Sequence, residues 1–175
     1  MTKTGTLQFE NGIRFLVRHI PLSDENSRKP ILFHSIRVGV YLYDHGYSEN
    51  VVLAGLLHDV IEWSSATEDI VQDEFGEEVL RLILANTKDD TIADKHEKTD
   101  ELIQRCLKNG QDALIVKTAD ILDSFKWYAS KDNTEQLTYC MRNANAIFKY
   151  KKHDFSDPIF DELATWRRKF EHLNK

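Results

Sequence analysis

Apolar residues recur every three to four positions along most of the chain, the spacing of helices that bury one face. Polar, glycine and proline positions interrupt this pattern, and no alternating run is long enough to indicate a strand. The pattern therefore predicts an all-α fold, a helical bundle of about eight helices, with a polar loop or exposed helix start at residues 88–99. The expected helical segments are residues 6–20, 31–44, 49–63, 68–75, 77–87, 100–108, 112–127, 133–150 and 158–173.

The chain has no repeat, low-complexity tract or clear linker, so we expect a single domain over residues 1–175. The composition is that of a folded domain, since 41% of the residues are hydrophobic and only 7 are Gly and 3 are Pro. The 23 basic and 29 acidic residues give a net charge of −6, which disfavours nonspecific binding to nucleic acid or to an anionic membrane. A local basic pocket for one phosphate group remains compatible with this charge.

The cysteines and the apolar runs of the sequence indicate in which cellular compartment the protein is expected. Cys106 and Cys140 lie far apart with no CxxC spacing, which argues against a disulfide framework and a structural zinc ribbon. The N-terminus lacks the apolar core of a secretory signal, and the longest strongly apolar run, residues 51–57, is far too short to span a membrane. We therefore expect a soluble, cytoplasmic protein with reduced thiols.

Segment 49–63 carries charged residues where a core is expected. Apolar residues cover nearly the whole circumference of this predicted helix, which should therefore be buried. At about 100° per residue, His58, Asp59 and Glu62 share one sector of it. Because an isolated buried carboxylate is too costly to stay ionised, a positive group should face that sector.

Two other predicted helices repeat this anomaly. Asp120 lies among apolar residues in ALIVKTADILDSF, and His34 stands near the start of segment 31–44. Two imidazoles and two carboxylates form a plausible cage for a divalent transition metal. Hydrogen-bonded core histidines and an Asp120–Lys117 ion pair are the alternative, which the pattern alone leaves open.

These residues resemble the signature H…HD…D of the HD superfamily of metal-dependent phosphohydrolases. Within it, the chain is similar to the (p)ppGpp hydrolase domains of the RelA/SpoT type and their small stand-alone relatives. The segments AGLLHDVIE, DEFGEEVLRLILANTK and ALIVKTADILDSF carry the resemblance, together with the spacing of 24 residues from His34 to His58. The motif-bearing core then covers about residues 28–125, and the resemblance implies one HD domain with the C-terminal helices 133–173 packed on that core.

The resemblance implies a metal centre and a catalytic acid. One divalent ion is expected, Mn²⁺ as in this subgroup, although Mg²⁺, Fe²⁺, Co²⁺, Ni²⁺ or Zn²⁺ fit the same ligand types. The hydrolases have two adjacent acids after the HD motif, implicated in activating water. Glu62 retains the first and is the expected general base, whereas Trp63 replaces the second. The implied metal ligands are His34, His58, Asp59 and Asp120.

Four residues are candidates for substrate binding. Arg28 and Lys29 keep the residue types of the family's basic loop, although that loop is shorter here, and they are expected to bind phosphates. Ser124 replaces the family's Asn. Trp63 stacks on a base in one interpretation and closes the core in the other, which we favour from the sequence.

The resemblance implies an enzyme that hydrolyses a phosphoester or pyrophosphate bond in a small nucleotide, as (p)ppGpp hydrolases do. A nucleoside 5′-monophosphatase or another HD phosphohydrolase is one alternative. A metal-bound nucleotide-binding regulator with weak or no turnover is another, and Trp63 is the argument for it. A purely structural adaptor would leave the buried acids unexplained. We expect no nucleic-acid or membrane partner, and a homo-oligomer remains open.

Overall fold

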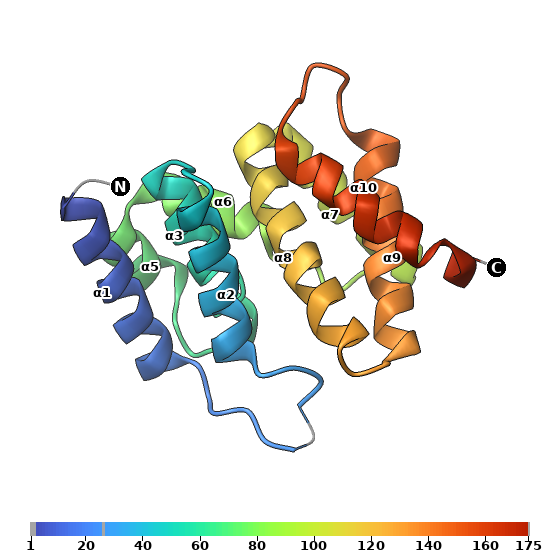
Figure 1. The fold of residues 1–175 in the computed structure, drawn as a ribbon. Helices are drawn as coiled ribbons and strands as arrows, with labels where there is room; N and C mark the ends of the chain where they lie inside the picture. Colours follow the sequence, from blue (N-terminus) through green and yellow to red (C-terminus); the bar gives the residue numbers. More distant parts are fainter. Residues whose placement is uncertain (1–2, 26, 175) are drawn as a thin grey trace. The chain divides into compact units, whose positions relative to one another are not determined.

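A computed structural model of the protein describes residues 3–25 and 27–174. Within these residues the chain forms ten α-helices and one short 3-10 helix, with no strand (Figure 1), so the all-α prediction is confirmed. The chain is organised as two compact units, Met1–Thr87 and Lys88–Lys175. Their boundary falls inside the motif-bearing segment 28–125. The single domain over residues 1–175, with helices 133–173 packed on that segment, stays a prediction.

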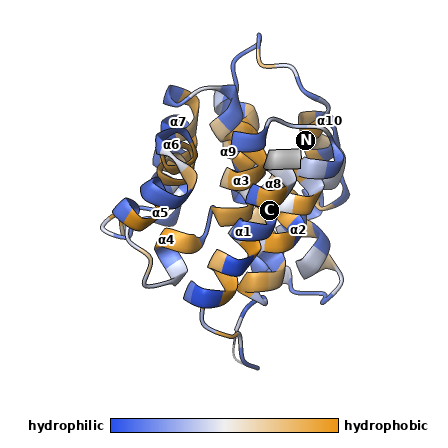
Figure 2. Cartoon of the chain, turned by 90° about the vertical axis from the view of Figure 1, so that its left-hand side faces the viewer, coloured by the Kyte–Doolittle hydropathy of each residue, from blue (hydrophilic) through white to orange (hydrophobic). Residues whose placement is uncertain are grey.

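In the first unit, helix α3 lies at the centre and packs against α1, α2 and α6. Ser48 caps its start by accepting the N–H of Val51. Most of α3 is hydrophobic (Figure 2), and every residue from Val51 to Leu57 is buried, as the pattern predicted. The helices of this unit are α1 Lys3–His19, α2 Ile31–Asp44, α3 Glu49–Leu57, α4 Val60–Trp63, α5 Glu68–Phe75 and α6 Glu77–Asn86.

A turn at His58 and Asp59 separates α3 from α4, so the prediction of one continuous helix over residues 49–63 was wrong. The backbone of Asp59, at φ −93° and ψ −3°, lies in the bridge region that active-site residues often occupy. The His58 ring bonds the carbonyl oxygen of Gly55. In an unbroken helix that oxygen accepts the N–H of Asp59, so the side chain competes with the helix. The spacing of apolar residues carries no information on this competition, so it could not predict the turn.

In the second unit, the long helix α8 packs against α7, α9 and α10. Helix α7 starts earlier than the predicted residue 100, because Asp94 accepts the N–H groups of His96 and Glu97 and caps the helix there. Residues 88–99, expected as a polar loop or an exposed helix start, thus comprise a connecting segment and the first five residues of α7. The helices of this unit are α7 Lys95–Lys108, α8 Gln111–Ala129, α9 Thr134–Tyr150, α10 Pro158–Lys169 and the 3-10 helix η1 Glu171–Asn174.

Two kinds of contact hold the second unit together. Phe125 of α8 stacks on Trp166 and Phe170 at ring-centroid distances of 6.3 and 5.9 Å. Helices α7 and α9 are joined by Asp100, whose Oδ2 accepts hydrogen bonds from Lys149 Nζ at 2.8 Å and Tyr150 Oη at 2.7 Å. Among the described helices, none is long and apolar enough to cross a membrane.

Candidate metal centre

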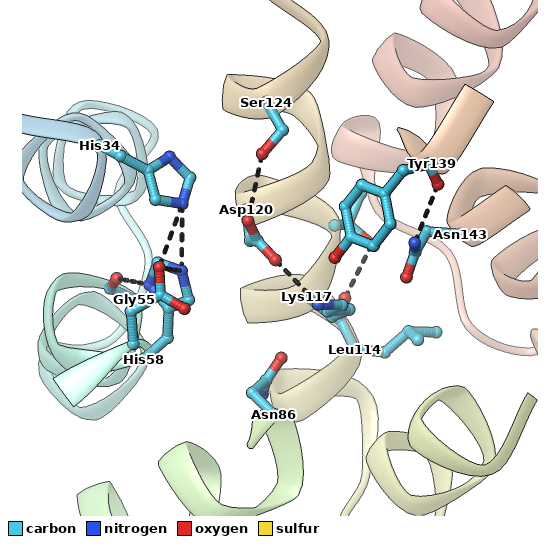
Figure 3. A network of polar contacts seen from close by, with 12 residues as sticks. His34, Gly55, His58, Asn86, Leu114, Lys117, Asp120, Ser124, Tyr139 and Asn143 are labelled. Atoms are coloured by element: carbon cyan, nitrogen blue, oxygen red, sulfur yellow. Dashed lines mark hydrogen bonds and ion pairs between the residues drawn. The ribbon is translucent and has the colours of Figure 1, made fainter. Parts of the chain in front are cut away.

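Three predicted ligands converge in the first unit. His34 projects from α2, and His58 and Asp59 form the turn after α3. The Nε2 atoms of the two imidazoles lie 3.2 Å apart (Figure 3), and Asp59 Oδ2 lies 3.7 Å from Nε2 of His34 and 3.4 Å from Nε2 of His58. All three side chains are buried, with at most 6% of each residue exposed. The fold thus gathers two nitrogen donors and one oxygen donor from helix α2 and from the turn that follows α3.

The orientation of His58 is set by its backbone partner. Its Nδ1 lies 2.7 Å from the carbonyl oxygen of Gly55 (Figure 3). A carbonyl oxygen only accepts, so Nδ1 carries the hydrogen and donates it. In the neutral ring Nε2 then keeps its lone pair and directs it toward His34 and Asp59. Metal-binding histidines in proteins are commonly held by this type of contact.

The donor set fits a divalent transition metal. Imidazole nitrogen with carboxylate oxygen suits such ions. With metal–ligand bonds of about 2.1 Å, ligands at right angles are about 3.0 Å apart. The separations of 3.2, 3.4 and 3.7 Å between the donor atoms are close to that spacing.

Asp59 is held in its ionised form. Burial alone would raise the pKa of its carboxyl group, but the charge and hydrogen bond of His58, with the charges of Lys29 and His34, hold that pKa well below its ordinary value. Lys29 Nζ lies 2.7 Å from His34 Nε2. Lys29 is therefore the positive group that the sequence led us to expect near the charged residues of segment 49–63.

Arg28 and Lys29 lie in the segment that connects α1 to α2. Lys29 is half-buried at the cluster, whereas Arg28 is exposed. The hydroxyl of Ser23 accepts the N–H of Ile31 at 3.0 Å, which ties the segment to the first turn of α2. This contact of Ser23 was not predicted from the sequence. Pro30 precedes α2 and has no side-chain hydroxyl or carboxylate to cap the helix, which was the one sign that another residue caps it.

Glu62 and Trp63 lie on the one-turn helix α4 that follows the turn. Glu62 is half-buried, and 51% of Trp63 is exposed. The favoured interpretation of Trp63 as a residue that closes the core was therefore wrong. Because α4 begins anew after Asp59, the angles of one continuous helix do not describe how these side chains are arranged. The catalytic role of Glu62 and the binding role of Trp63 stay predictions.

Asp120 and Ser124 belong to the second unit, on α8. Asp120 Oδ2 accepts a hydrogen bond from Lys117 Nζ at 2.8 Å, and Ser124 Oγ lies 3.4 Å from Oδ1 (Figure 3). Burial alone would lower the pKa of Lys117, but the charges of Asp120 and Tyr139 outweigh burial and raise it. The ion pair that the sequence left open as an alternative for Asp120 is present.

The chain belongs to the HD domain family, which matches residues 14–149. The resemblance to this family is therefore confirmed. A guanosine-3′,5′-bis(diphosphate) 3′-pyrophosphohydrolase of Aquifex aeolicus is 23% identical over 97% of this chain and 27% of its own length. The pyrophosphohydrolase MESH1 of Drosophila melanogaster is 33% identical over 55% of each chain, and that of Mus musculus is 35% identical over 53% and 52%. The chain thus spans about a quarter to a half of these relatives.

Two solved structures share the fold. A metazoan SpoT ortholog that hydrolyses ppGpp has a TM-score of 0.73 and 20% identity, covering 93% of this chain and 95% of that one. The protein lmo0812 of Listeria monocytogenes EGD-e has a TM-score of 0.64 and 24% identity, covering 84% and 98%. At these identities the matches establish the all-α architecture.

Proposed function

We propose that the chain is a metal-dependent phosphohydrolase that cleaves the 3′-pyrophosphate of a guanosine nucleotide of the (p)ppGpp type. The observation that carries the proposal is the buried cluster of His34, His58 and Asp59, with its donor atoms 3.2–3.7 Å apart. The Aquifex, Drosophila and mouse relatives are named guanosine-3′,5′-bis(diphosphate) 3′-pyrophosphohydrolases, which supports this substrate class. Asp120, the remaining acid of the family signature, is proposed as the fourth ligand. Mn²⁺ is the proposed ion.

The reaction needs a water that attacks phosphorus, neutralisation of the negative charge on the phosphoryl oxygens, and an oxygen that leaves phosphorus. A divalent ion at this site supplies positive charge to the phosphoryl oxygens and lowers the pKa of bound water. Glu62 accepts the proton of the water at its carboxylate. The water oxygen then forms a bond to phosphorus as the bond from phosphorus to the ribose 3′ oxygen breaks. The 3′ oxygen takes up a proton from solvent and becomes a hydroxyl, and the products are pyrophosphate and the nucleotide with a free 3′-hydroxyl. Arg28 and Lys29 bind the remaining phosphate oxygens, and Trp63 and Ser124 are proposed to contact the nucleoside.

A nucleotide panel tests the proposal. The full chain is purified without added metal, its metal content is measured, and ppGpp, deoxynucleoside monophosphates and a generic phosphodiester are offered with Mn²⁺. Pyrophosphate release from ppGpp, absent in Asp59→Ala, is the expected result. Phosphate release from monophosphates without pyrophosphate release from ppGpp would instead define a nucleotidase.

The second candidate function is a nucleotide-binding regulator that retains the metal but turns over poorly. The observation that favours it is Trp63, an exposed indole where the family's hydrolases carry their second acid. An indole cannot take part in proton transfer to water, but it can stack on a base. Tight ppGpp binding with bound metal and no pyrophosphate release would select this function.

A further inference from the structure

Lys29 makes a short contact with His34, one of the proposed metal ligands. Lys29 Nζ lies 2.7 Å from His34 Nε2, within the range of charge-assisted hydrogen bonds. An ammonium group has three donors and no acceptor. His34 Nε2 is therefore the acceptor of this contact. Because His34 is fully buried and Lys29 is half-buried, water screens the contact only in part.

The same nitrogen of His34 faces the other donor atoms of the cluster. It lies 3.2 Å from Nε2 of His58 and 3.7 Å from Oδ2 of Asp59. In the neutral form of His58, Nε2 is an acceptor as well, because Nδ1 donates to the Gly55 carbonyl. Two acceptor nitrogens do not hydrogen-bond to each other, so their approach is stabilised by a positive group beside them. Lys29 provides that group.

The charge of Lys29 also acts on the carboxylate of the cluster. Burial alone would raise the pKa of Asp59, but the charge and hydrogen bond of His58, with the charges of Lys29 and His34, lower it. One ammonium group thus binds the imidazole of His34 and favours the ionised form of Asp59. Imidazole nitrogen and carboxylate oxygen are the two donor types that suit a divalent transition metal. Lys29 and such an ion therefore need the same groups.

Lys29 and a metal ion cannot use Nε2 of His34 at the same time. A neutral imidazole has a single lone pair at this atom, and a metal–nitrogen bond is only about 2.1 Å long. An ammonium group at 2.7 Å from the same nitrogen would also place two positive charges close together, which is unfavourable. Lys29 lies in the segment between α1 and α2 and has a flexible four-carbon side chain, so it can leave His34 without moving a helix.

We propose that Lys29 is an exchangeable cation of the site: it competes with the divalent ion for His34, and on metal binding it moves to the phosphate groups of the substrate. The inference rests on the proposed function, in which His34 is a ligand and Lys29 binds phosphate. It concerns only residues of the first unit and does not depend on Asp120. Metal binding and phosphate binding are then coupled through one side chain, and each favours the other.

Mn²⁺ titration calorimetry of the full chain tests the competition. Lys29→Met keeps the length of the side chain and removes the ammonium group, so it should bind Mn²⁺ about 10- to 100-fold more tightly than wild type. Arg18→Met is the matched control. It removes one positive charge from an exposed position at the end of α1, where solvent screens it, so its affinity should stay within about twofold of wild type.

The direction of the change separates this proposal from a positioning role. A lysine that only orients His34 would weaken Mn²⁺ binding when it is removed. Weaker or unchanged binding in Lys29→Met would therefore overturn the competition.

Labelling of the wild-type chain tests the movement of Lys29 without any variant. An amine-reactive reagent is applied with and without saturating Mn²⁺, and mass spectrometry of the peptides gives the labelling rate of each lysine. Mn²⁺ should raise the rate at Lys29. Lys149, whose Nζ binds Asp100 at 2.8 Å in the second unit, should be labelled equally under both conditions. An unchanged rate at Lys29 would show that its ammonium group stays in place.

Steady-state kinetics tests the transfer to phosphate. At saturating Mn²⁺, Lys29→Met should raise the KM for ppGpp more than it lowers kcat, because it removes a contact to bound substrate. An unchanged KM would overturn the transfer.

The further inference and the proposed function fail in different ways. If Mn²⁺ binds neither wild type nor Lys29→Met, the proposed metal centre is wrong and the inference falls with it. If Mn²⁺ binds both with equal affinity, the competition is wrong and the metal centre stands. If Lys29→Met binds Mn²⁺ more tightly but wild type hydrolyses no nucleotide, the competition stands and the hydrolase function is wrong.

Discussion

The cluster of His34, His58 and Asp59 shows how single residues define this site. The Gly55 carbonyl fixes the proton of His58, the turn places Asp59 beside it, and Lys29 adds positive charge. The charges around Asp59 favour its ionised carboxylate, the form that binds a divalent ion.

Two substitutions distinguish metal binding from catalysis. Asp59→Ala removes a proposed ligand and is expected to lower metal content and activity together. Glu62→Gln preserves shape but cannot accept a proton, so it should keep its metal while kcat falls by about 10²- to 10⁴-fold. Metal analysis and steady-state kinetics on the same preparations measure both. A Glu62→Gln enzyme with the wild-type rate would show that another group takes the proton.

Ser35 is a residue whose removal should help. Its hydroxyl is fully buried and is the one buried side-chain polar atom without a hydrogen-bond partner in the described part of the chain. Since an unpaired buried hydroxyl is unfavourable, Ser35→Ala should raise the free energy of unfolding by about 1 kcal/mol.

Ser48→Ala serves as the matched control for this prediction. It removes the cap of α3 and should lower the free energy of unfolding by about 1 kcal/mol. Urea denaturation measures both variants. If the two substitutions changed the free energy of unfolding in the same direction, this account of Ser35 would be contradicted.

At the scale of elements, periodicity predicted the helices well and their ends less well. The bounds of α2 and α5 match the predicted segments, because apolar spacing agrees there with the flanking residues, Pro30 before α2 and the capping Thr67 before α5. The turn at His58 was missed, and the exact start of α7 was left open, because single side-chain contacts decide both. The Gly55 carbonyl binds a ring in the first case, and Asp94 caps two N–H groups in the second.

The α2–α3 contact depends on a glycine. A Cβ on Gly39 would lie 2.9 Å from Cβ of Leu56 and 3.2 Å from its Cα, so the helices would have to separate. Gly39→Ala should therefore lower the free energy of unfolding by about 1–3 kcal/mol, although alanine favours helix. Val40→Ala, at the next and more exposed position, should change it by less than about 0.5 kcal/mol. Denaturant titration measures the free energy of unfolding of both variants, and a Gly39→Ala variant that is more stable than wild type would disprove the close contact.

Helices α7 and α9 are joined by a pH-sensitive contact. Burial would raise the pKa of Asp100, but the hydrogen bonds and charge of Lys149 and Tyr150 lower it. A lowered pKa means that this stabilisation is fully present above the unfolded value of about 3.9 and is lost as the pH falls through the folded value. The contact is partly exposed, so its contribution should be below about 1 kcal/mol.

A double-mutant cycle tests this contact. Asp100→Asn and Lys149→Met should be non-additive in unfolding free energy at pH 6, and their coupling should become smaller at a second, acidic pH as the carboxyl group is protonated. Urea denaturation at the two pH values supplies the measurements. A coupling that is equal at both pH values would exclude the ionised carboxylate as its source.

For the whole molecule, the all-α class and the HD family were predictable because both depend on features that are local in sequence. Helical spacing is one, and charged residues in buried segments are the other. The exposed position of Trp63 was not predictable, because an indole suits a core and a surface equally. The division into two compact units was not predictable either, because no composition change or proline- and glycine-rich linker marks residues 87 and 88.

Metal removal tests the proposed centre at this scale. A ligand that binds only the folded state stabilises it by about 2.7 kcal/mol when its free concentration is 100 times its dissociation constant. Mn²⁺ should therefore raise the melting temperature of the full chain, and a chelator should reverse the rise. Because Asp59 and Asp120 are both proposed ligands, Asp59→Ala and Asp120→Ala should each abolish the rise, while Val40→Ala should keep it. If Asp120→Ala kept the full metal-dependent rise, Asp120 would not be a ligand, and His34, His58 and Asp59 would be the protein ligands.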